Sequence, residues 1–292
     1  MRQGMRTSAL CAAFALAAMP AFAQASARES TDGSAQQTME NLALQPLGSG
    51  GVGQIAPEPR DVDAFVAANL EWLVTHALAT LLTETFGYDA PDADAADSFA
   101  SSRVSARHDD EEAARRLAFV AEAFSLASVG DAPSYFATND LDRARAFRVL
   151  CVANGADNAI ARDAMGFADA PPDGFDGCAV DRDLATEEWD VALSADFAFP
   201  DDPPGDVAVR YAEPDEGDAN ARAAIERSGV LEALADEVAT TYSLFDPLTL
   251  EARSCDGGAG ELVVERATLT VCYGLVDALR ALARPSPTNA VE

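Results

Sequence analysis

Apolar side chains occupy most sides of one predicted helix near residue 70. Its apolar residues are Val62, Phe65, Val66, Leu70, Leu73, Val74, Ala77, Leu78, Leu81 and Leu82. This pattern is typical of a buried helix at the centre of a domain, because a surface helix keeps one polar face. His76 interrupts the apolar pattern. Asp61 or Asp63 can cap the start of the helix, and a Gly87-Tyr88 turn follows it.

Helical patterns continue through the first two thirds of the chain. Pro91 forces a break, and Asp92 or Asp94 can cap a short helix that reaches about Ala106. From Asp109 onward, acids in the first turn and an apolar stripe predict an amphipathic helix. Further helices are predicted at Leu141–Ala153, closed by Asn154-Gly155, at Asn158–Phe167, and around Thr186–Leu193, where Trp189 is expected to anchor the core.

Beyond Pro200 the hydrophobic pattern changes, and strands become more frequent. Short strands are predicted at 207–211, 248–253 and 262–271. Helices are predicted at 219–244, with an interruption at Ser228-Gly229, and at about 273–283. Helices therefore dominate, and the last third contributes a small β-sheet. This combination predicts an α+β fold.

Both ends of the chain are predicted to lie outside the folded domain. Residues 1–23 have the charged start, the apolar run and the Ala21-Phe22-Ala23 pattern of a cleavable secretory signal peptide. Residues 24–59 lack periodicity and are rich in Ser, Gln, Gly and Ala, which predicts a disordered linker. We expect one globular domain at 60–284, a flexible tail at 285–292, and a periplasmic or secreted protein.

The composition is strongly acidic, with a formal net charge of −29, and all 20 cationic residues are arginines. Nucleic acids and anionic membranes are therefore excluded as expected partners, because their phosphates would be repelled. A solvated acidic surface that keeps a secreted protein soluble explains this charge. The central helix carries Asp63, Glu71 and Glu84, so we expect no membrane span in the mature chain.

Four cysteines remain after the signal peptide, which contains Cys11. An even number in an exported chain predicts disulfides, and four cysteines allow three pairings. Local closure favours Cys151–Cys178 and Cys255–Cys272. A zinc site formed by these cysteines is the competing interpretation, but the chain has no CxxC pair.

The residues around His76 resemble a bacterial family of metallopeptidases of otherwise unknown function. The similar segments are the run into His76, the Gly87-Tyr88 turn and Asp94-Ala95-Ala96-Asp97-Ser98-Phe99-Ala100. Members of that family carry HExGH, then a Gly-containing turn and a Glu-Glu-x-Ala-Ala-Asp-x-Phe-Ala segment. Thr270-Val271-Cys272-Tyr273 is similar to a second family segment, and related sequences have cysteines at the four positions, which implies the same disulfide pairing. The resemblance implies a mainly helical, zincin-like domain.

The metal motif of that family is degenerate in this chain. By the resemblance, His76 matches the first zinc histidine, Ala77 the catalytic glutamate and Thr80 the second histidine. Asp92 and Ala93 stand at the acidic pair that would supply the remaining ligand. Alanine accepts no proton and a neutral hydroxyl is a poor zinc ligand, so we expect no zinc, no other cofactor and no hydrolysis. The resemblance therefore implies a metallopeptidase-like pseudoenzyme, a binding or structural protein with a vestigial groove in which a peptide or protein is one candidate partner.

An altered metal-dependent hydrolase is the alternative function. His76 would then bind zinc with Asp92, Asp94 or Asp97, and with His108 if the fold brings them together. However, His108 lies in a polar helix start, so we expect it to be exposed and solvated. For His76 we expect a neutral core histidine that is hydrogen-bonded to a backbone carbonyl or a nearby acid.

Overall fold

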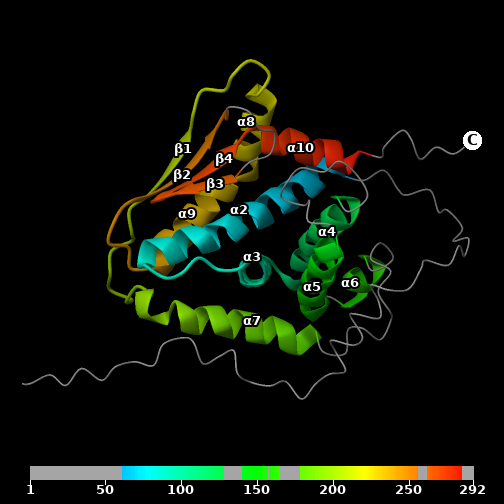
Figure 1. Ribbon diagram of the computed structural model, residues 1–292, viewed down its shortest axis with the longest axis horizontal. Helices are drawn as coiled ribbons and strands as arrows, with labels where there is room; N and C mark the ends of the chain where they lie inside the picture. Colours follow the sequence, from blue (N-terminus) through cyan, green and yellow to red (C-terminus); the bar gives the residue numbers. More distant parts are fainter. Residues whose placement is uncertain (1–60, 128–139, 157, 165–177, 256–261, 285–292) are drawn as a thin grey trace, which may run out of the picture. The chain divides into compact units, whose positions relative to one another are not determined.

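The computed structural model describes residues 61–127, 140–156, 158–164, 178–255 and 262–284 (Figure 1). The chain divides into two compact units, at residues 1–53 and 54–292, and all described residues belong to the second unit. The predicted signal peptide, linker and tail lie outside the described residues, as does the C-terminal end of the helix predicted at 158–167.

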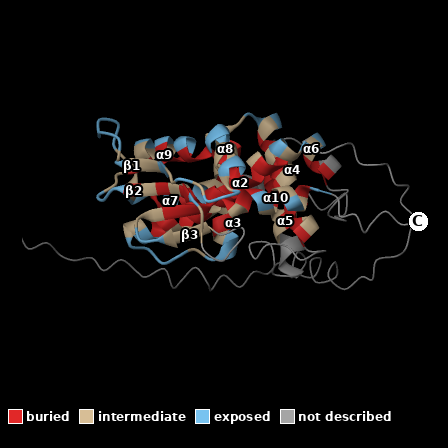
Figure 2. Ribbon diagram, turned by 90° about the horizontal axis from the view of Figure 1, so that it is seen from above, coloured by how far each residue is buried: buried red, intermediate tan, exposed pale blue. Residues whose placement is uncertain are grey.

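The predicted central helix is α2, Val62–Phe86. Asp61 caps it by accepting hydrogen bonds from the backbone of Asp63 and Ala64, and Gly87 ends it in the left-handed region at φ 77°. Figure 2 shows this helix in the middle of the buried residues. Its length and apolar composition would be sufficient to cross a membrane, but 83% of its most apolar 18-residue window is buried inside the protein, as in a core helix.

Helices pack around α2 and against one another. The helical neighbours of α2 include α3 (Ala93–Arg107), α4 (Asp110–Ala127) and the last helix of the chain, α10 (Gly274–Ala283). Both α3 and α4 pack against α5 (Asp140–Ala156). In addition, α3 contacts α7 (Cys178–Ala192) and α4 contacts α6 (Asn158–Ala164). Asp92 caps α3. Most of these helices confirm the predicted positions, and Trp189 is buried as expected.

Two predicted helix boundaries were wrong. The helix α5 does not close at Asn154-Gly155 but continues to Ala156, because a glycine tolerates helical geometry at a cost of about 1 kcal/mol that packing can offset. The helix α7 starts at Cys178, well before Thr186. A disulfide joins Cys178 to Cys151 of α5, and it holds this first turn against the helix core.

The last third forms a four-stranded sheet with the order β1-β2-β4-β3. Its strands are β1 (Val207–Tyr211), β2 (Leu248–Arg253), β3 (Leu262–Glu265) and β4 (Thr268–Cys272). Parallel pairs join β1 to β2 and β2 to β4, whereas β3 is antiparallel to β4. The single strand predicted at 262–271 is therefore wrong. It is a hairpin that turns at Arg266, the non-glycine residue with a positive φ, 55°, in the described chain.

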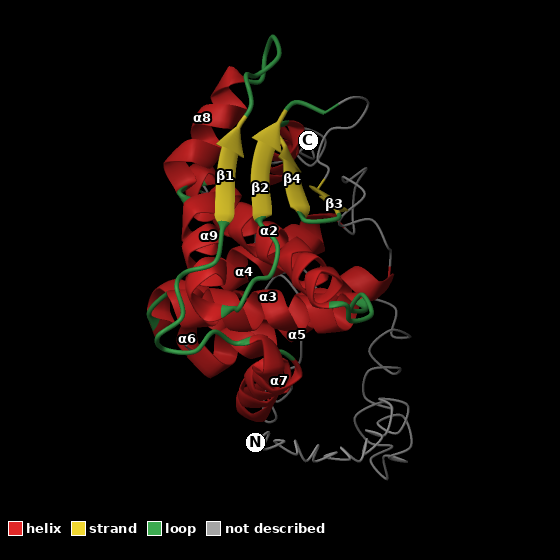
Figure 3. Ribbon diagram, turned by 90° about the vertical axis from the view of Figure 1, so that its left-hand side faces the viewer, coloured by secondary structure: helices red, strands yellow, loops and turns green. Residues whose placement is uncertain are grey.

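The helices α8 (Ala219–Ser228) and α9 (Val230–Thr241) connect β1 to β2, and α10 (Gly274–Ala283) follows β4. Gly229 at φ 63° separates α8 from α9, which confirms the predicted interruption. Figure 3 shows the sheet in front of the helices, and β2 alternates buried with more exposed residues, as expected of a sheet with one covered face. The fold is a mixed, mainly helical α/β structure, and the expected dominance of helices and the small sheet in the last third are confirmed.

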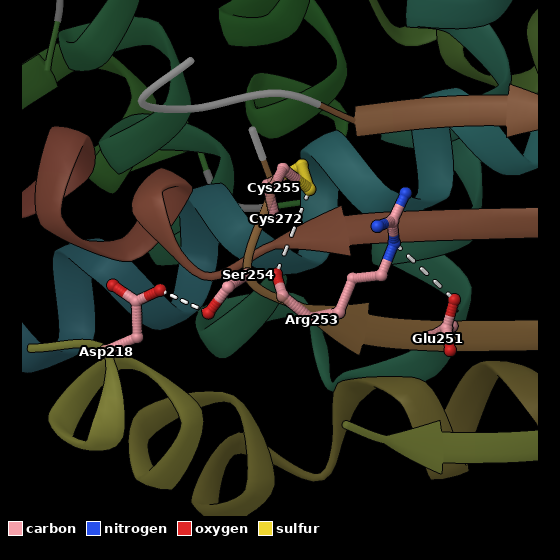
Figure 4. Close-up of a disulfide and its surroundings, with 6 residues drawn as sticks. All are labelled: Asp218, Glu251, Arg253, Ser254, Cys255 and Cys272. Atoms are coloured by element: carbon pink, nitrogen blue, oxygen red, sulfur yellow. Dashed lines mark hydrogen bonds and ion pairs between the residues drawn. A yellow bond between two sulfur atoms is a disulfide. The ribbon is translucent and has the colours of Figure 1, made fainter. Parts of the chain in front are cut away.

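Both predicted disulfides, Cys151–Cys178 and Cys255–Cys272, are present. The second joins the residues after β2 to the end of β4, beside the Ser254 hydroxyl that donates to Asp218 (Figure 4). It therefore links the sheet across two neighbouring strands, close to the start of α8. Two disulfides fit a protein that folds in an oxidising compartment.

Candidate functional site

His76 lies opposite a buried carboxylate that belongs to the next helix. Its Nε2 is 3.2 Å from Asp97 Oδ1. The packing of α2 against α3 therefore brings these two side chains together. This Nε2 is buried and, among the described residues, has no partner in good hydrogen-bond geometry. His76 therefore lies beside an acid, as predicted, but the predicted hydrogen bond is not formed in good geometry, and the side chain is 27% exposed and not fully in the core.

Arg145 of α5 occupies the other side of the same carboxylate. Its Nε donates to Asp97 Oδ2 at 2.7 Å, and its Nη2 donates to Asp97 Oδ1 at 2.7 Å, a bidentate ion pair. The Asp97 side chain is 3% exposed and that of Arg145 is 12% exposed. Both oxygens of Asp97 thus accept hydrogen bonds from a guanidinium in a site that is largely shielded from solvent.

Aromatic rings hold this guanidinium in place. Its Cζ lies 4.5 Å from the centroid of the Phe124 ring and 6.0 Å from that of Trp72, within the range of cation–π attraction. The Trp72 ring also lies 5.3 Å from the His76 ring, and Trp72 Nε1 donates to Ser101 at 3.0 Å. Side chains from α2, α3, α4 and α5 therefore converge on one cluster, His76–Asp97–Arg145.

The charge of Asp97 follows from these contacts. Burial raises the pKa of its carboxyl, but the hydrogen bonds from Arg145 and the contact with His76 outweigh burial, so the pKa lies below its usual value. Asp97 is therefore ionised at neutral pH, and Arg145 supplies the compensating positive charge.

The other predicted ligand positions have different partners. Asp92 caps α3 by accepting from Ala95 N at 2.8 Å, and Asp94 forms an ion pair with Arg148. Ala77 is buried, and the Thr80 side chain is a turn beyond His76 on the same helix. Within the described ranges, no three His, Cys, Asp or Glu side chains converge closely enough to hold a metal ion.

The expectation that His108 is exposed and solvated was wrong. Its side chain is 24% exposed, and its Nε2 lies 3.0 Å from both carboxylate oxygens of Glu71. The polar sequence around it resembles a solvated helix start, but the turn between α3 and α4 folds back onto α2. The two histidines therefore pair with different carboxylates, His76 with Asp97 and His108 with Glu71.

Glu71 is the centre of a second buried ion cluster. Arg107 Nη1 donates to its Oε1 at 2.6 Å, and Arg116 Nη1 donates to its Oε2 at 2.8 Å. Burial raises the pKa of Glu71, but the hydrogen bond from His108 and the charges of Arg107 and Arg116 lower it further than burial raises it. Arg107 continues the network to Glu237 of α9 through its Nε at 2.7 Å.

Sequence reasoning missed Arg145 and the Glu71 cluster. One signal was available, because Glu71 is an acid in the middle of an otherwise apolar helix and must be paired if that helix is buried. Arg145 had no such signal. It lies in a helix with several arginines, and only the packing of α5 on α3 selects it as the partner of Asp97.

A groove lies between α3 and α7, at a distance along α3 from Asp97. Its volume is about 560 Å³, and it is lined by Ser102, Ser105, Ala106, Asp183, Thr186, Glu187, Asp190, Val191 and Ser194. His76 is not among these residues. The groove between α3 and α7 is therefore not the groove around His76 that the family resemblance implies.

Comparisons with known proteins add nothing to these observations: no protein-family model, no curated protein and no solved structure matches this chain.

Proposed function

We propose that this chain is a secreted or periplasmic metallopeptidase-like protein that has lost zinc hydrolysis, a pseudoenzyme on a zincin-like scaffold. One observation carries the proposal. The carboxylate that faces His76 is neutralised by Arg145 through two hydrogen bonds of 2.7 Å. A guanidinium thus supplies the positive charge that a catalytic metal ion would supply beside this histidine.

The residues present do not fit a zinc ion. A catalytic zinc needs three protein ligands and one open position. Here Ala77 and Thr80 stand at the positions of the base and of the second histidine, and neither can replace them. A cation bound to Asp97 would have to displace Arg145 or lie next to its charge, and both are unfavourable in a site this buried.

The positions of two helices support the proposal. The helix α2 presents His76 and, one turn later, Thr80 on the same side, and the helix that contains the similar acidic segment, α3, packs beside it. The acid beside His76 is Asp97 and not Asp92, where the resemblance places a ligand, because Asp92 caps α3.

Metal analysis tests the loss of zinc. The chain is produced in zinc-supplemented medium, purified without chelators, and compared with His76→Ala for zinc content and for hydrolysis of unfolded casein. We expect far less than one zinc per chain, and the same background hydrolysis from both proteins. Stoichiometric zinc and proteolysis that both disappear in His76→Ala would overturn the proposal and favour the altered hydrolase.

Restoring the motif tests the scaffold. Ala77→Glu/Thr80→His/Arg145→Met rebuilds the motif and removes the competing guanidinium, and Ala77→Glu/Thr80→His is the matched control that retains it. We expect the triple variant to bind zinc more tightly than the double variant, because only the triple variant frees Asp97 from the two hydrogen bonds of Arg145. If both variants are folded by circular dichroism and bind no more zinc than the original chain, the zincin-like assignment is wrong.

A further inference from the structure

We propose that the outer edge of β1 binds an extended peptide, which adds a strand to the sheet and places a carboxylate beside Arg210. This edge lies away from His76, because α2 packs against β3 and β4 at the other side of the sheet. Strand addition at β1 is therefore separate from the proposed loss of zinc and does not depend on it.

The outer side of β1 presents main-chain groups that have no partner. Figure 3 shows β1 as the outermost strand, and its only neighbour in the described sheet is β2. Hydrogen bonds to β2 begin at Asp206 O and end at Ala212 N, both 2.9 Å long, so the even-numbered residues face β2. The N–H and C=O groups of Val207, Val209 and Tyr211 therefore point outward, where no hydrogen bond between described residues reaches them.

The strand β1 has few features that protect its edge from pairing. Natural sheet edges are usually blocked by a proline, a bulge or an inward-pointing charge, because unpaired main-chain groups can bind a further strand. The strand is regular over Val207–Tyr211, contains no proline, and has no charge among its inward-pointing side chains. Pro203-Pro204 and Pro214 flank it. These prolines confine an added strand to the length of β1.

The two faces of β1 determine which side chains the peptide needs. Val207 and Val209 lie opposite buried leucines of β2, on the face that α9 covers. Arg210 points to the open face and is exposed, and none of the described side chains forms an ion pair with it. Glu251, opposite it on β2, lies 3.7 Å from Arg253 instead. Side chains of an added strand alternate between the two faces, so the peptide alternates apolar and polar residues, with an acid beside Arg210.

The position of α9 favours a peptide over a second copy of this protein. The helix packs more against β1 than against β2, and Tyr211 Oη donates to Glu232 of α9 at 2.8 Å. A helix is about 10 Å wide, whereas paired strands are about 4.8 Å apart. Two copies joined edge to edge would therefore bring their α9 helices closer than the 8–10 Å at which helices typically pack. A peptide brings no helix and fits beside β1.

Fluorescence anisotropy with the full chain tests strand addition. The probe is a fluorescein-labelled nonapeptide that begins with threonine, alternates threonine with valine, and has glutamate at its centre. Two further peptides are N-methylated, one on the valine amides and the other on the remaining amides. Amides of alternate residues point to opposite edges of a strand, so only one methylated set faces β1. We expect that peptide to lose roughly tenfold or more in affinity and the other to bind like the probe. Equal affinities of the two methylated peptides would overturn the proposal.

Val209→Pro tests the edge on the protein side. It removes an outward-facing N–H and leaves the hydrogen bonds to β2 in place, so the variant should remain folded by circular dichroism. We expect it to lose roughly tenfold in affinity for the probe. Unchanged affinity in the folded variant would remove the peptide from this edge.

Arg210→Glu tests the charge of the ligand. The matched control is Arg284→Glu, at an exposed residue that ends α10. The probe is compared with a peptide that has lysine in place of the central glutamate. We expect Arg210→Glu to shift the ratio of the two affinities roughly fivefold toward the lysine peptide, and Arg284→Glu to leave the ratio nearly unchanged. Equal shifts in both variants would show diffuse attraction and overturn the assignment of Arg210.

Sedimentation velocity without peptide tests the other occupant. We expect a monomer. A dimer of the original chain that disappears in Val209→Pro would assign the edge to a second copy and overturn the peptide assignment. None of these measurements involves zinc or hydrolysis, so their failure would leave the pseudoenzyme proposal standing, and the reverse also holds.

Discussion

Removing Arg145 from its ion pair with Asp97 should lower the stability of the fold by several kcal/mol. Arg145→Met removes the charge but keeps an unbranched side chain that can still contact the rings of Phe124 and Trp72. Asp97, 3% exposed at its side chain, would then lose both of its short hydrogen bonds and keep only His76 at 3.2 Å and the more distant Arg148 at 3.9 Å. Removal of one partner from a buried pair typically costs about 3–5 kcal/mol, a large share of the roughly 5–15 kcal/mol that stabilises a domain.

Urea unfolding followed by circular dichroism measures this effect. The matched control is Arg115→Met, because Arg115 forms ion pairs with Glu111 and Glu112 on the exposed side of α4, where its side chain is 48% exposed. Exposed pairs contribute about 0–1 kcal/mol, so the control should unfold at nearly the original urea concentration.

A double variant separates the charge from general damage to packing. Arg145→Met/Asp97→Asn removes both charges, so it should recover a large part of the stability lost by Arg145→Met alone. The reasoning is refuted if Arg145→Met costs no more than Arg115→Met. It is also refuted if Asp97→Asn, added to Arg145→Met, restores nothing.

Further predictions concern the second cluster, acid pH and the C-terminal disulfide. Glu71→Gln should lower the free energy of unfolding by about 1.5–3 kcal/mol, because Arg107 and Arg116 lose the buried carboxylate that they share and keep only Glu237 and Glu112. Glu111→Gln on the exposed face should cost under about 1 kcal/mol, and equal effects in urea unfolding would contradict this prediction. The pKa values of Glu71 and Asp97 are lowered in the folded state, so their stabilisation is complete above about pH 4.5 and is lost as the pH falls through the folded pKa values. The stability difference between the original chain and Asp97→Asn should therefore shrink in unfolding curves taken from pH 6 down to pH 3, and a constant difference would argue against the assignment. Replacing both Cys255 and Cys272 with serine, or reducing their disulfide, should lower the free energy of unfolding by about 3 kcal/mol, because the bridge closes a short loop in the unfolded chain. An unchanged unfolding midpoint would show that the bridge does not restrict the unfolded chain.

Local patterns were sufficient to predict most elements of this fold. The position of α2 follows from its apolar residues, and its ends follow from Asp61 and Gly87, because capping depends on neighbours within a few residues. The hairpin β3–β4 was missed for the opposite reason. Its turn at Arg266 has neither glycine nor proline, so nothing local marks the reversal that pairing with β4 imposes.

Local sequence also determined that Ala77 and Thr80 can serve neither as a general base nor as a good zinc ligand, since their side chains are known without any structure. Only the tertiary structure decided which cation neutralises the carboxylate beside His76. Arg145 lies 48 residues after Asp97, and it becomes its partner because α5 packs against α3. Likewise, the turn between α3 and α4 brings the chain back to α2, so His108 contacts Glu71 and is not solvated. Ion pairs in a core depend on which helices are in contact. Contact between helices that are distant in the sequence depends on the burial of their whole apolar faces, so it cannot be predicted from a short segment of sequence.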